Sequence, residues 1–588
     1  MKFLVFIKQV PNTAEIQFDP AKKTLIRSGV KTEINPYDRR ALSEAIRYRN
    51  ENGGEVIAIT MGPDCSRDGL LESLIMGVDS AIHIKDSRLA GSDTLATSRV
   101  LAAVARKLGF DIIFCGQHST DSETGQVPVE VAELLQIPCA TAVTKIEYLQ
   151  DRTIQPTCET EEGWMRLEMR LPAVISTAER LIKPIKTKNV DLSTAPTEKI
   201  REFKIDDLGL LENEVGFSGS PTWVADIRDV RVIRTPESWD GSDVPATACK
   251  LLKLCSERGG RAAESVDAVS NNPSEYWCWV ETFNDRISPV SFEMISAAAT
   301  LGTACARVKG TLTREVKEEL SQHGATKIFA LPSDLHLDES VSTICEKVQT
   351  NPPFAVLFPA TTRGRYLAGR IAARLQLGLT GDCVGLDLDE QGRLAQLKPA
   401  FGGNIVAPIY SRTFPHLATI RAGALRKIVR SNERTADVVR WNIPADVHLT
   451  FSILAHEMDM GAEAGKLDEA RVAVCIGAGI GESNIPLANR LSSLLDASLG
   501  ATRRVVDLGW LPRQYQIGLT GKFIAPEVYL GFAISGRYNH MIGVQKAGTL
   551  VAINSDPNAE VFKVVDVGVV GDAVEIMNEM VRQLEDTN

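Results

Sequence analysis

The sequence has no apolar run long enough to cross a membrane. A transmembrane helix needs about 18 consecutive apolar residues, and no such stretch occurs in the 588 residues. Near the start, the apolar run Phe3–Ile7 is followed by Lys8 and is too short for the core of a signal peptide. We therefore expect a soluble, cytoplasmic protein.

Metal-binding spacings and an excess of positive charge are also missing. The 11 cysteines are scattered singly, without the CxxC or CxH spacing of zinc or iron–sulfur sites, so we expect reduced core cysteines and no metal site. The net charge is −10, from 65 Lys and Arg against 75 Asp and Glu. This balance disfavours nucleic acid and anionic lipid as partners, and leaves small molecules and proteins.

Short apolar runs alternate with helix-like segments in the first part of the chain. The runs Lys2–Lys8, Val56–Met61, Ser80–Ile84 and Asp111–Cys115 are typical of strands, and apolar residues recur every three or four positions between them. The pattern predicts an α/β fold with helix-covered parallel sheets, whose ligands bind at the carboxyl ends of strands. At about 150 residues per domain, the length suggests three or four domains.

Short polar segments separate the apolar runs of the segment Gly500–Asp572. The polar segments include Thr502-Arg503, Gln516–Gly521, Ser535–His540 and Asn554–Asp556. This layout is typical of a parallel sheet that presents its loops to a nucleotide.

The motifs in both halves of the chain resemble electron-transfer flavoproteins. GATRRVVD, QIGLTGK, SGRYNH, AINSDP and DVGVVGD resemble the FAD-binding domain of the large (alpha) subunit; IKQVPNT, NPYD, MGPDCSRDG and CGQHSTDSETGQVPVEVAELL resemble the small (beta) subunit. ATTRGRYLAGRIAARLQLGLTGDCVGLDLD and LKPAFGGNIVAPI are similar to the first alpha domain. The resemblance implies a natural beta–alpha fusion.

The resemblance also implies a domain order. It predicts a beta-like domain over residues 1–240, a linker over 241–274 that contains a short helix at Ala246–Cys255, an alpha-like first domain over 275–440 and an FAD-binding domain over 441–588. The fold class is three doubly wound parallel-sheet domains, adenine-nucleotide-hydrolase-like and Rossmann-like, in which the two halves are distant copies of one sheet. A hinge is expected in the charged segment Arg430–Asp446.

For the C-terminal FAD site, the resemblance implies ten binding residues. Arg503 is expected beside the isoalloxazine ring, His540 near its N1 and C2=O, Thr520 near N5, and Gln516 along the ring loop. Ser535 is expected toward the phosphates, Asn554 and Asp566 at the adenosine end, and Gly518, Gly521 and Gly536 where backbone amides approach closely. The chain departs from the family at Leu519, where a glutamine is common, and at Gly477-Ala478-Gly479, which is usually Gly-Arg-Gly. Taken singly, His540 and Arg503 are also compatible with ordinary core and surface positions.

In this family a second pocket, in the beta-like domain, holds either AMP or a second FAD. Its expected residues are Gln9, Asp121, Thr124, Gln126 and Val127. The small Gly125 and the T-x-Q-V core favour FAD, whereas Ser122 and the missing glycine before Pro128 fit that type less well. The polar residues Thr120–Thr124 also suit a cap on a following helix, and a helix start of this kind binds phosphate.

We expect electron transfer rather than chemistry by catalytic side chains, because the sequence has no nucleophile elbow, P-loop or paired-carboxylate motif. The leading prediction is a carrier with two FAD that moves electrons from a dehydrogenase or NADH to another redox protein. Alternatives are a flavin-based electron-bifurcating enzyme that oxidises NADH, a single-FAD carrier with structural AMP, and a nucleotide-binding module of the universal-stress type without redox function.

Predicted partners are an acyl-CoA dehydrogenase-like flavoprotein or a quinone- or ferredoxin-linked oxidoreductase. In the family, the loop equivalent to Arg180–Phe203 docks on acyl-CoA dehydrogenases through a leucine. Asn189 stands nearest to that leucine here, with Val190 and Leu192 as substitutes, and the lysines of this loop also suit a solvated face.

Overall fold

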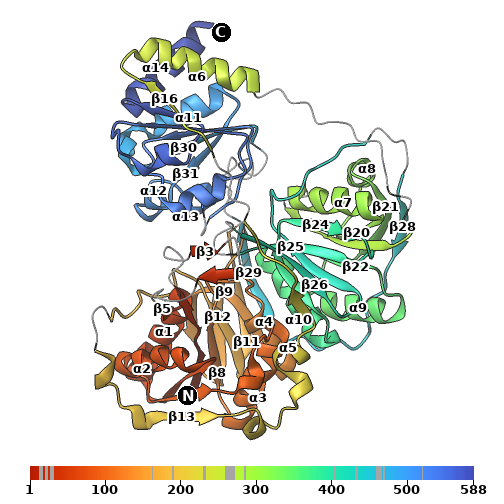
Figure 1. The fold of residues 1–588 in the computed structure, drawn as a ribbon. Helices are drawn as coiled ribbons and strands as arrows, with labels where there is room; N and C mark the ends of the chain where they lie inside the picture. Colours follow the sequence, from red (N-terminus) through yellow and green to blue (C-terminus); the bar gives the residue numbers. More distant parts are fainter. Residues whose placement is uncertain are drawn as a thin grey trace. The chain divides into compact units, whose positions relative to one another are not determined.

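The computed structural model describes residues 1–587 except 12–16, 20–23, 27–31, 162, 188–190, 230–233, 259–269, 271, 284–285, 401–404, 431–434, 459–466, 468–469 and 519–520 (Figure 1). The chain forms two compact units. Unit 1 comprises residues 1–229, 267–421 and 429–459, and unit 2 comprises residues 230–266, 422–428 and 460–588.

The first sheet of unit 1 contains ten strands. Their order is β13 (Ile200–Phe203), β7 (Ser80–Ile84), β6 (Glu55–Met61), β1 (Lys2–Phe6), β8 (Ile112–Gly116), β12 (Ala173–Thr177), β9 (Cys139–Tyr148), β10 (Thr153–Glu159), β11 (Gly163–Arg170) and β29 (Ser452–Met458). The strands from β13 to β9 are parallel, and β10, β11 and β29 extend the sheet antiparallel. The main helices of this half are α1 (Pro36–Asn52), α2 (Arg67–Met76), α3 (Thr94–Leu108) and α4 (Val127–Leu135).

The second sheet of unit 1 is entirely parallel. Its order is β23 (Leu379–Cys383), β27 (His416–Ile420), β22 (Ala355–Pro359), β17 (Glu275–Val280), β20 (Thr303–Lys309), β21 (Ala325–Leu331) and β28 (Asp437–Arg440). Its helices are α7 (Pro289–Leu301), α8 (Arg314–Gln322), α9 (Leu337–Thr350) and α10 (Thr362–Leu375).

Strands exchanged between the two halves hold unit 1 together. β29, from the C-terminal half of the chain, pairs with β11 of the first sheet. A smaller antiparallel sheet has the order β14 (Thr222–Val224), β26 (Ile405–Ser411), β25 (Leu394–Ala400) and β24 (Gly385–Leu388), so β14 from the N-terminal half completes strands of the C-terminal half. The beta-like and first alpha-like regions therefore form one body.

Unit 2 contains one parallel sheet. Its order is β16 (Glu237–Asp240), β34 (Val567–Val570), β33 (Thr549–Asn554), β32 (Val528–Phe532), β30 (Val472–Ile476) and β31 (Ser498–Ala501). Its helices are α6 (Val244–Arg258), α11 (Ile485–Leu494), α12 (Arg503–Asp507), α13 (Tyr538–Met541) and α14 (Ala573–Thr587). The expected fold class, three doubly wound parallel-sheet domains, is confirmed.

Helix starts follow the local sequence. The Asp93 carboxylate accepts a hydrogen bond of 3.0 Å from the Ala96 amide at the start of α3, and Gly109 ends the helix with a φ of +65°. At α10, the Thr361 hydroxyl accepts from the Gly364 amide at 2.9 Å. Such short polar residues satisfy the amides that a helix leaves unpaired at its first turn.

The domain boundaries need correction at two places. Part of the expected linker 241–274 belongs to the folded core of unit 2, because it contains α6, whose Ala248, Leu251 and Cys255 are buried there. The strand before it, β16, also belongs to unit 2, since it pairs with β34. Residues 259–269 lie outside the described residues. The expected boundary at residue 440 precedes β29, which belongs to unit 1. Long-range strand pairing, which local patterns do not reveal, determines both.

The hinge expected at Arg430–Asp446 is also corrected. Arg430 is buried and donates to the His323 carbonyl at 2.6 Å, and β28 pairs with β21. Apart from residues 431–434, which lie outside the described residues, this segment packs within unit 1.

Nine of the cysteines are buried, and Cys65 and Cys249 are exposed. Among the described residues, no cluster of side chains suits a metal ion, and no helix is sufficiently long and apolar to cross a membrane.

Candidate functional site

The ligand-binding edge of unit 2 lies at the carboxyl ends of its strands. The chain passes from β30 to β31 on one side and then returns to β32 on the other side of β30, which makes a topological switch point between β30 and β32. Doubly wound sheets bind ligands at such points. A Cβ built on Gly477, which follows β30, would lie 2.1 Å from the Ala533 carbonyl oxygen, so only glycine allows the two loops to approach this closely. The sequence Gly477-Ala478-Gly479 differs from the family's Gly-Arg-Gly at its second residue, but it retains the glycine at position 477 that this contact requires.

The loop after β32 needs a glycine for a similar reason. Gly536 has a φ of +79°, and a Cβ there would lie 2.2 Å from the Val561 Cα. Ser535 beside it is exposed at the carboxyl edge. The loop after β32 therefore packs on Val561 through backbone atoms, and its exposed residues at the carboxyl edge stand where doubly wound sheets bind phosphate or pyrophosphate.

The expected ring loop is a tight turn. Gln516 is 4% exposed, and its carbonyl accepts from the Lys522 amide at 2.7 Å. A Cβ on Gly518 would lie 2.3 Å from the Asn539 carbonyl oxygen, and a Cβ on Gly521 would lie 2.2 Å from that of Gln516. Thr520 lies outside the described residues, so its expected place near N5 stays a prediction.

Arg503 begins α12 directly after β31. Its side chain is 46% exposed and its Nε lies 3.1 Å from the Asp507 carboxylate. The guanidinium thus belongs to the loop next to the switch point, where the resemblance expects the isoalloxazine.

The His540 imidazole points into the core of unit 2. Its Nδ1 lies 3.0 Å from the Ile517 carbonyl oxygen, and its Nε2 lies 2.7 Å from the Tyr529 hydroxyl. Burial lowers the pKa of His540 to about 4, against a smaller raising effect of the Ile517 carbonyl. Both nitrogens therefore have protein partners and the ring is neutral, and the expected place of His540 near N1 and C2=O stays a prediction.

The adenosine-end residues divide between the two edges of the sheet. Asn554 ends β33 at the carboxyl edge, where its amide donates to the Ile534 carbonyl at 2.8 Å. Asp566 precedes β34 and accepts from the Leu550 amide at 2.7 Å and from Arg234, so it lies at the opposite edge and is corrected to a structural role. Asp572, after β34, is the acidic residue at the ligand edge that the sequence reading missed. The sequence feature that could have identified Asp572 is its position just after the apolar run Val567–Val570, where the carboxyl end of a strand is expected.

The first sheet of unit 1 has its own switch point, between β1 and β8. The Asp38 carboxylate joins the two strand ends, because it accepts from the Lys8 amide at 2.8 Å and the Gly116 amide at 2.9 Å. Above it, the Lys8 ammonium lies 2.7 Å from the Asp121 carboxylate. Burial has the largest single effect and raises the pKa of Asp121, but Lys8, the Ser119 hydroxyl and a backbone hydrogen bond together leave that pKa below its usual value.

The predicted second-pocket residues gather at this edge. Gln126 is 1% exposed and accepts from the Thr94 hydroxyl at 2.8 Å, directly before Val127 opens α4. Gln9 ends the loop after β1, and Thr124 precedes Gly125 in the loop after β8.

Buried polar atoms around this pocket suit a polar ligand. Gln9 Oε1, Glu123 Oε1 and Gln126 Nε2 are buried without a hydrogen-bond partner among the described residues. Buried polar groups are rarely left unsatisfied, and missing water or ligand is the usual explanation. The residues present therefore fit a nucleotide at the β1–β8 edge.

Residues of the first alpha-like region also lie at the second pocket, and the sequence analysis did not predict them. Arg421 lies 3.3 Å from Glu123 and also pairs with Asp382, and Arg365 lies 3.2 Å from Asp382. Burial raises the pKa of Glu123, and Arg421 lowers it by less. The motifs TTRGR and LTGD contain Arg365 and Asp382, but Arg421 lies outside the motifs that carry the resemblance.

The equivalent edge of the second sheet is already filled. The Thr362 amide and hydroxyl, at the start of α10, both donate to Glu161 Oε1, at 2.7 and 3.1 Å. A phosphate at this helix start would compete with the carboxylate.

Comparison with known proteins agrees with this geometry. The model of the electron transfer flavoprotein domain matches residues 22–208 and 277–446, and that of the electron transfer flavoprotein FAD-binding domain matches residues 466–545. The chain is 32% identical to the electron transfer flavoprotein subunit alpha of Thermoanaerobacterium thermosaccharolyticum (54% of this chain, 99% of that protein) and 39% identical to its subunit beta (41% and 93%). It is also 31% identical to the lactate dehydrogenase (NAD(+),ferredoxin) subunit LctC of Acetobacterium woodii (59% and 87%). The chain belongs to the electron transfer flavoprotein family, as a fusion of a beta-like N-terminal half with an alpha-like C-terminal half that ends in the FAD-binding domain.

Proposed function

We propose that this protein carries electrons between other redox proteins by means of two FAD, one in each unit. The observation that carries the proposal is the agreement between the FAD-binding domain match and the glycine-lined loops at the switch point of unit 2. When bound, FAD supplies reversible one- and two-electron chemistry. The electrons come from a flavin dehydrogenase or NADH and leave to a second redox protein.

The side chains of unit 2 bind the flavin and adjust its potential. Arg503 supplies a fixed positive charge at the end of β31, which favours the anionic reduced forms of a flavin ring nearby. The backbone around Gly536 holds the pyrophosphate, and Asn554 and Asp572 hold the adenosine end of the cofactor. The loop at Gly518 excludes water from one edge of the ring.

For the second nucleotide, the small Gly125 favours FAD over AMP. Gly125 has a φ of +63°, and a Cβ there would lie 3.3 Å from the Gln117 carbonyl oxygen, so the loop is shaped around a residue without a side chain. Two further observations suit either nucleotide. The unsatisfied atoms of Gln9, Glu123 and Gln126 suit a ligand with several polar groups, and Arg365 and Arg421, which pair with Asp382 and Glu123, bring positive charge to this edge.

Quantifying the nucleotides released by denaturation tests this assignment. Two FAD per chain are expected. One FAD and one AMP per chain would refute the second flavin and leave a single-FAD carrier. A colourless protein without FAD would refute the whole proposal.

A second candidate function is electron bifurcation from NADH. The relative LctC is named as part of an NAD(+)- and ferredoxin-linked lactate dehydrogenase, and this favours NADH or ferredoxin among the partners. The test is anaerobic reduction of the protein by NADH, with and without ferredoxin. Flavin bleaching that requires a second acceptor supports bifurcation, whereas no reduction by NADH supports the carrier.

Docking of an acyl-CoA dehydrogenase-like partner stays a prediction. Of the loop Arg180–Phe203, residues 188–190, which include Asn189 and Val190, lie outside the described residues, and the last four residues form β13. Leu192 is described and only half-buried.

A further inference from the structure

His540 lies where three elements of unit 2 meet. Its Nδ1 contacts the Ile517 carbonyl oxygen of the ring loop at 3.0 Å, and its Nε2 contacts the Tyr529 hydroxyl of β32 at 2.7 Å. The Cys475 Sγ of β30 lies 3.7 Å from the same Nε2. Tyr529 and Cys475 are both fully buried.

These partners determine which nitrogen carries the proton. A carbonyl oxygen only accepts, so Nδ1 must be the protonated nitrogen. In the neutral ring Nε2 is then an acceptor, and the Tyr529 hydroxyl is the donor that satisfies it. The opposite tautomer would place two acceptors, Nδ1 and the carbonyl oxygen, against each other.

Burial is the main influence on the charge of the ring. Among the described residues, the titratable side chains within hydrogen-bond distance of it are Tyr529 from β32 and Cys475 from β30, whose core cluster also contains the apolar Ile524, Ile534 and Met541. From the described part of the ring loop, the Ile517 backbone carbonyl reaches the ring. Burial in such surroundings disfavours the imidazolium.

The same imidazole holds the ring loop against α13. Ile517 directly precedes Gly518, and a Cβ on Gly518 would lie 3.1 Å from the His540 Cα and 2.3 Å from the Asn539 carbonyl oxygen. The loop and the helix therefore touch through backbone atoms. The hydrogen bond from His540 Nδ1 to Ile517 fixes this contact from the core side.

We propose that Tyr529 is a positioning residue of the FAD site. Its hydroxyl holds His540 in the neutral Nδ1–H tautomer, and His540 in turn holds the Gln516–Gly518 backbone in the position from which it borders the flavin. The second part rests on the proposed function, because it requires FAD at this loop. Fixed positive charge at the ring then comes from Arg503, and His540 contributes none between pH 5.5 and 8.

The tautomer can be measured directly by NMR in protein labelled with 15N-histidine, both with and without FAD. His540→Gln identifies the resonances. The proposal expects a protonated Nδ1 and an unprotonated Nε2 at pH 7, with no titration down to pH 5.5. A doubly protonated ring, or a proton on Nε2, overturns it whether or not FAD is bound.

Tyr529→Phe tests the positioning role, because it removes the hydroxyl and keeps the ring. We expect a mixture of tautomers and about a tenfold rise in the FAD dissociation constant, since an acceptor is left unsatisfied in the core. Tyr366→Phe is the matched control: Tyr366 is also buried, its hydroxyl lies 3.3 Å from the Asp338 carboxylate of unit 1, and its loss should leave FAD affinity unchanged.

A Tyr529→Phe variant that keeps both the wild-type tautomer and the wild-type FAD affinity overturns the proposal. If Tyr529→Phe does not fold, the spectra of Cys475→Ala are compared with those of the wild type. An unchanged Nδ1–H tautomer in Cys475→Ala means that the thiol is not required and that Tyr529 determines the tautomer. A changed tautomer in Cys475→Ala overturns the role of Tyr529. Wild-type protein that binds no FAD refutes the proposed function, and the spectra of the FAD-free protein still test the tautomer.

Discussion

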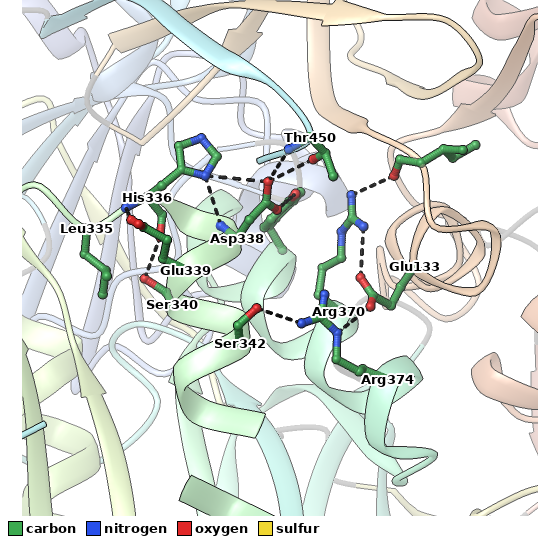
Figure 2. A network of polar contacts seen from close by, with 12 residues as sticks. Glu133, Leu335, His336, Asp338, Glu339, Ser340, Ser342, Arg370, Arg374 and Thr450 are labelled. Atoms are coloured by element: carbon green, nitrogen blue, oxygen red, sulfur yellow. Dashed lines mark hydrogen bonds and ion pairs between the residues drawn. The ribbon is translucent and has the colours of Figure 1, made fainter. Parts of the chain in front are cut away.

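Replacing Glu133 with alanine should weaken the packing between the two halves of unit 1. Glu133, on α4 of the beta-like region, accepts from Arg370 Nη1 at 2.9 Å and from Arg374 Nε at 2.6 Å, both on α10 (Figure 2). The Arg370 side chain is 2% exposed; when the carboxylate is removed, it keeps the Ile137 carbonyl, at 3.0 Å, and the face of the Tyr366 ring, but no anionic partner among the described residues. The substitution therefore leaves a buried, unpaired guanidinium.

The expected cost follows from the burial of each partner. Removing one member of a buried ion pair costs about 3–5 kcal/mol. The second arginine, Arg374, is 37% exposed, so its lost pair adds at most about 1 kcal/mol. Glu133→Ala should thus lower the free energy of unfolding of unit 1 by about 3–5 kcal/mol.

Urea unfolding followed by tryptophan fluorescence measures this effect, because Trp277, Trp279 and Trp441 are buried in unit 1. With a slope of about 3 kcal/mol per molar urea, the midpoint should fall by about 1–1.7 M. Flavin fluorescence should report release of the flavin of each unit, and the release from unit 2 should keep its midpoint. Because the loop before α4 carries the second pocket, the nucleotide of unit 1 should dissociate first.

Two variants make the test specific. Glu51→Ala removes the exposed pair with Arg47 on α1 and should cost only about 0.3–0.5 kcal/mol. In Glu133→Ala combined with Arg370→Met, removing both charges should recover most of the lost stability. If Glu133→Ala costs no more than Glu51→Ala, the argument from the buried charge fails.

Three further substitutions test the nucleotide sites. Gly536→Ala should abolish FAD binding, because its Cβ would lie 2.2 Å from the Val561 Cα and the loop would have to move. The control is Gly509→Ala, which has a similar φ of +78° but lies in open space; it should cost only about 1 kcal/mol of stability and keep FAD. Equal FAD content in the two variants would contradict the role of this loop in FAD binding. Gly125→Asn should reduce the flavin content from two per chain to one, since asparagine tolerates the left-handed backbone but its side chain would crowd the loop, where a Cβ already lies 3.3 Å from the Gln117 carbonyl oxygen; wild-type protein that already holds AMP would rule this out. Arg503→Ala should lower the potential of the C-terminal flavin in spectroelectrochemical titration, and an unchanged potential would show that its charge does not reach the ring.

Local patterns were sufficient for the parallel sheets and for the loops that bind nucleotides. The alternation of apolar strands with helices of period 3.6 is a short-range property, and it predicted the strands at Val56–Met61 and Asp111–Cys115 closely. Gly518 and Gly536 were expected from the resemblance of their motifs to the family, and the structure shows the atoms that a Cβ at each would meet.

Site residues whose roles depend on orientation could not be derived in this way. Asp566 and Asp572 are six positions apart, and only the observed ends of β34 show that Asp572 lies at the ligand edge. The side chain of His540 points into the core because Tyr529 and Ile517, distant in sequence, offer it hydrogen bonds there.

The sequence by itself determined the family, the α/β class and the loops that face a nucleotide, because these depend on residue spacing along short segments. Only the tertiary structure decided which segments belong to which unit: β29 joins the first sheet, and β16 and α6 join the last one. It also decided that Glu133 would pair with Arg370 across more than 200 residues. Strand partners and buried ion pairs are selected by long-range packing, since a strand edge or a buried charge is satisfied by whichever complementary segment the completed fold brings to it.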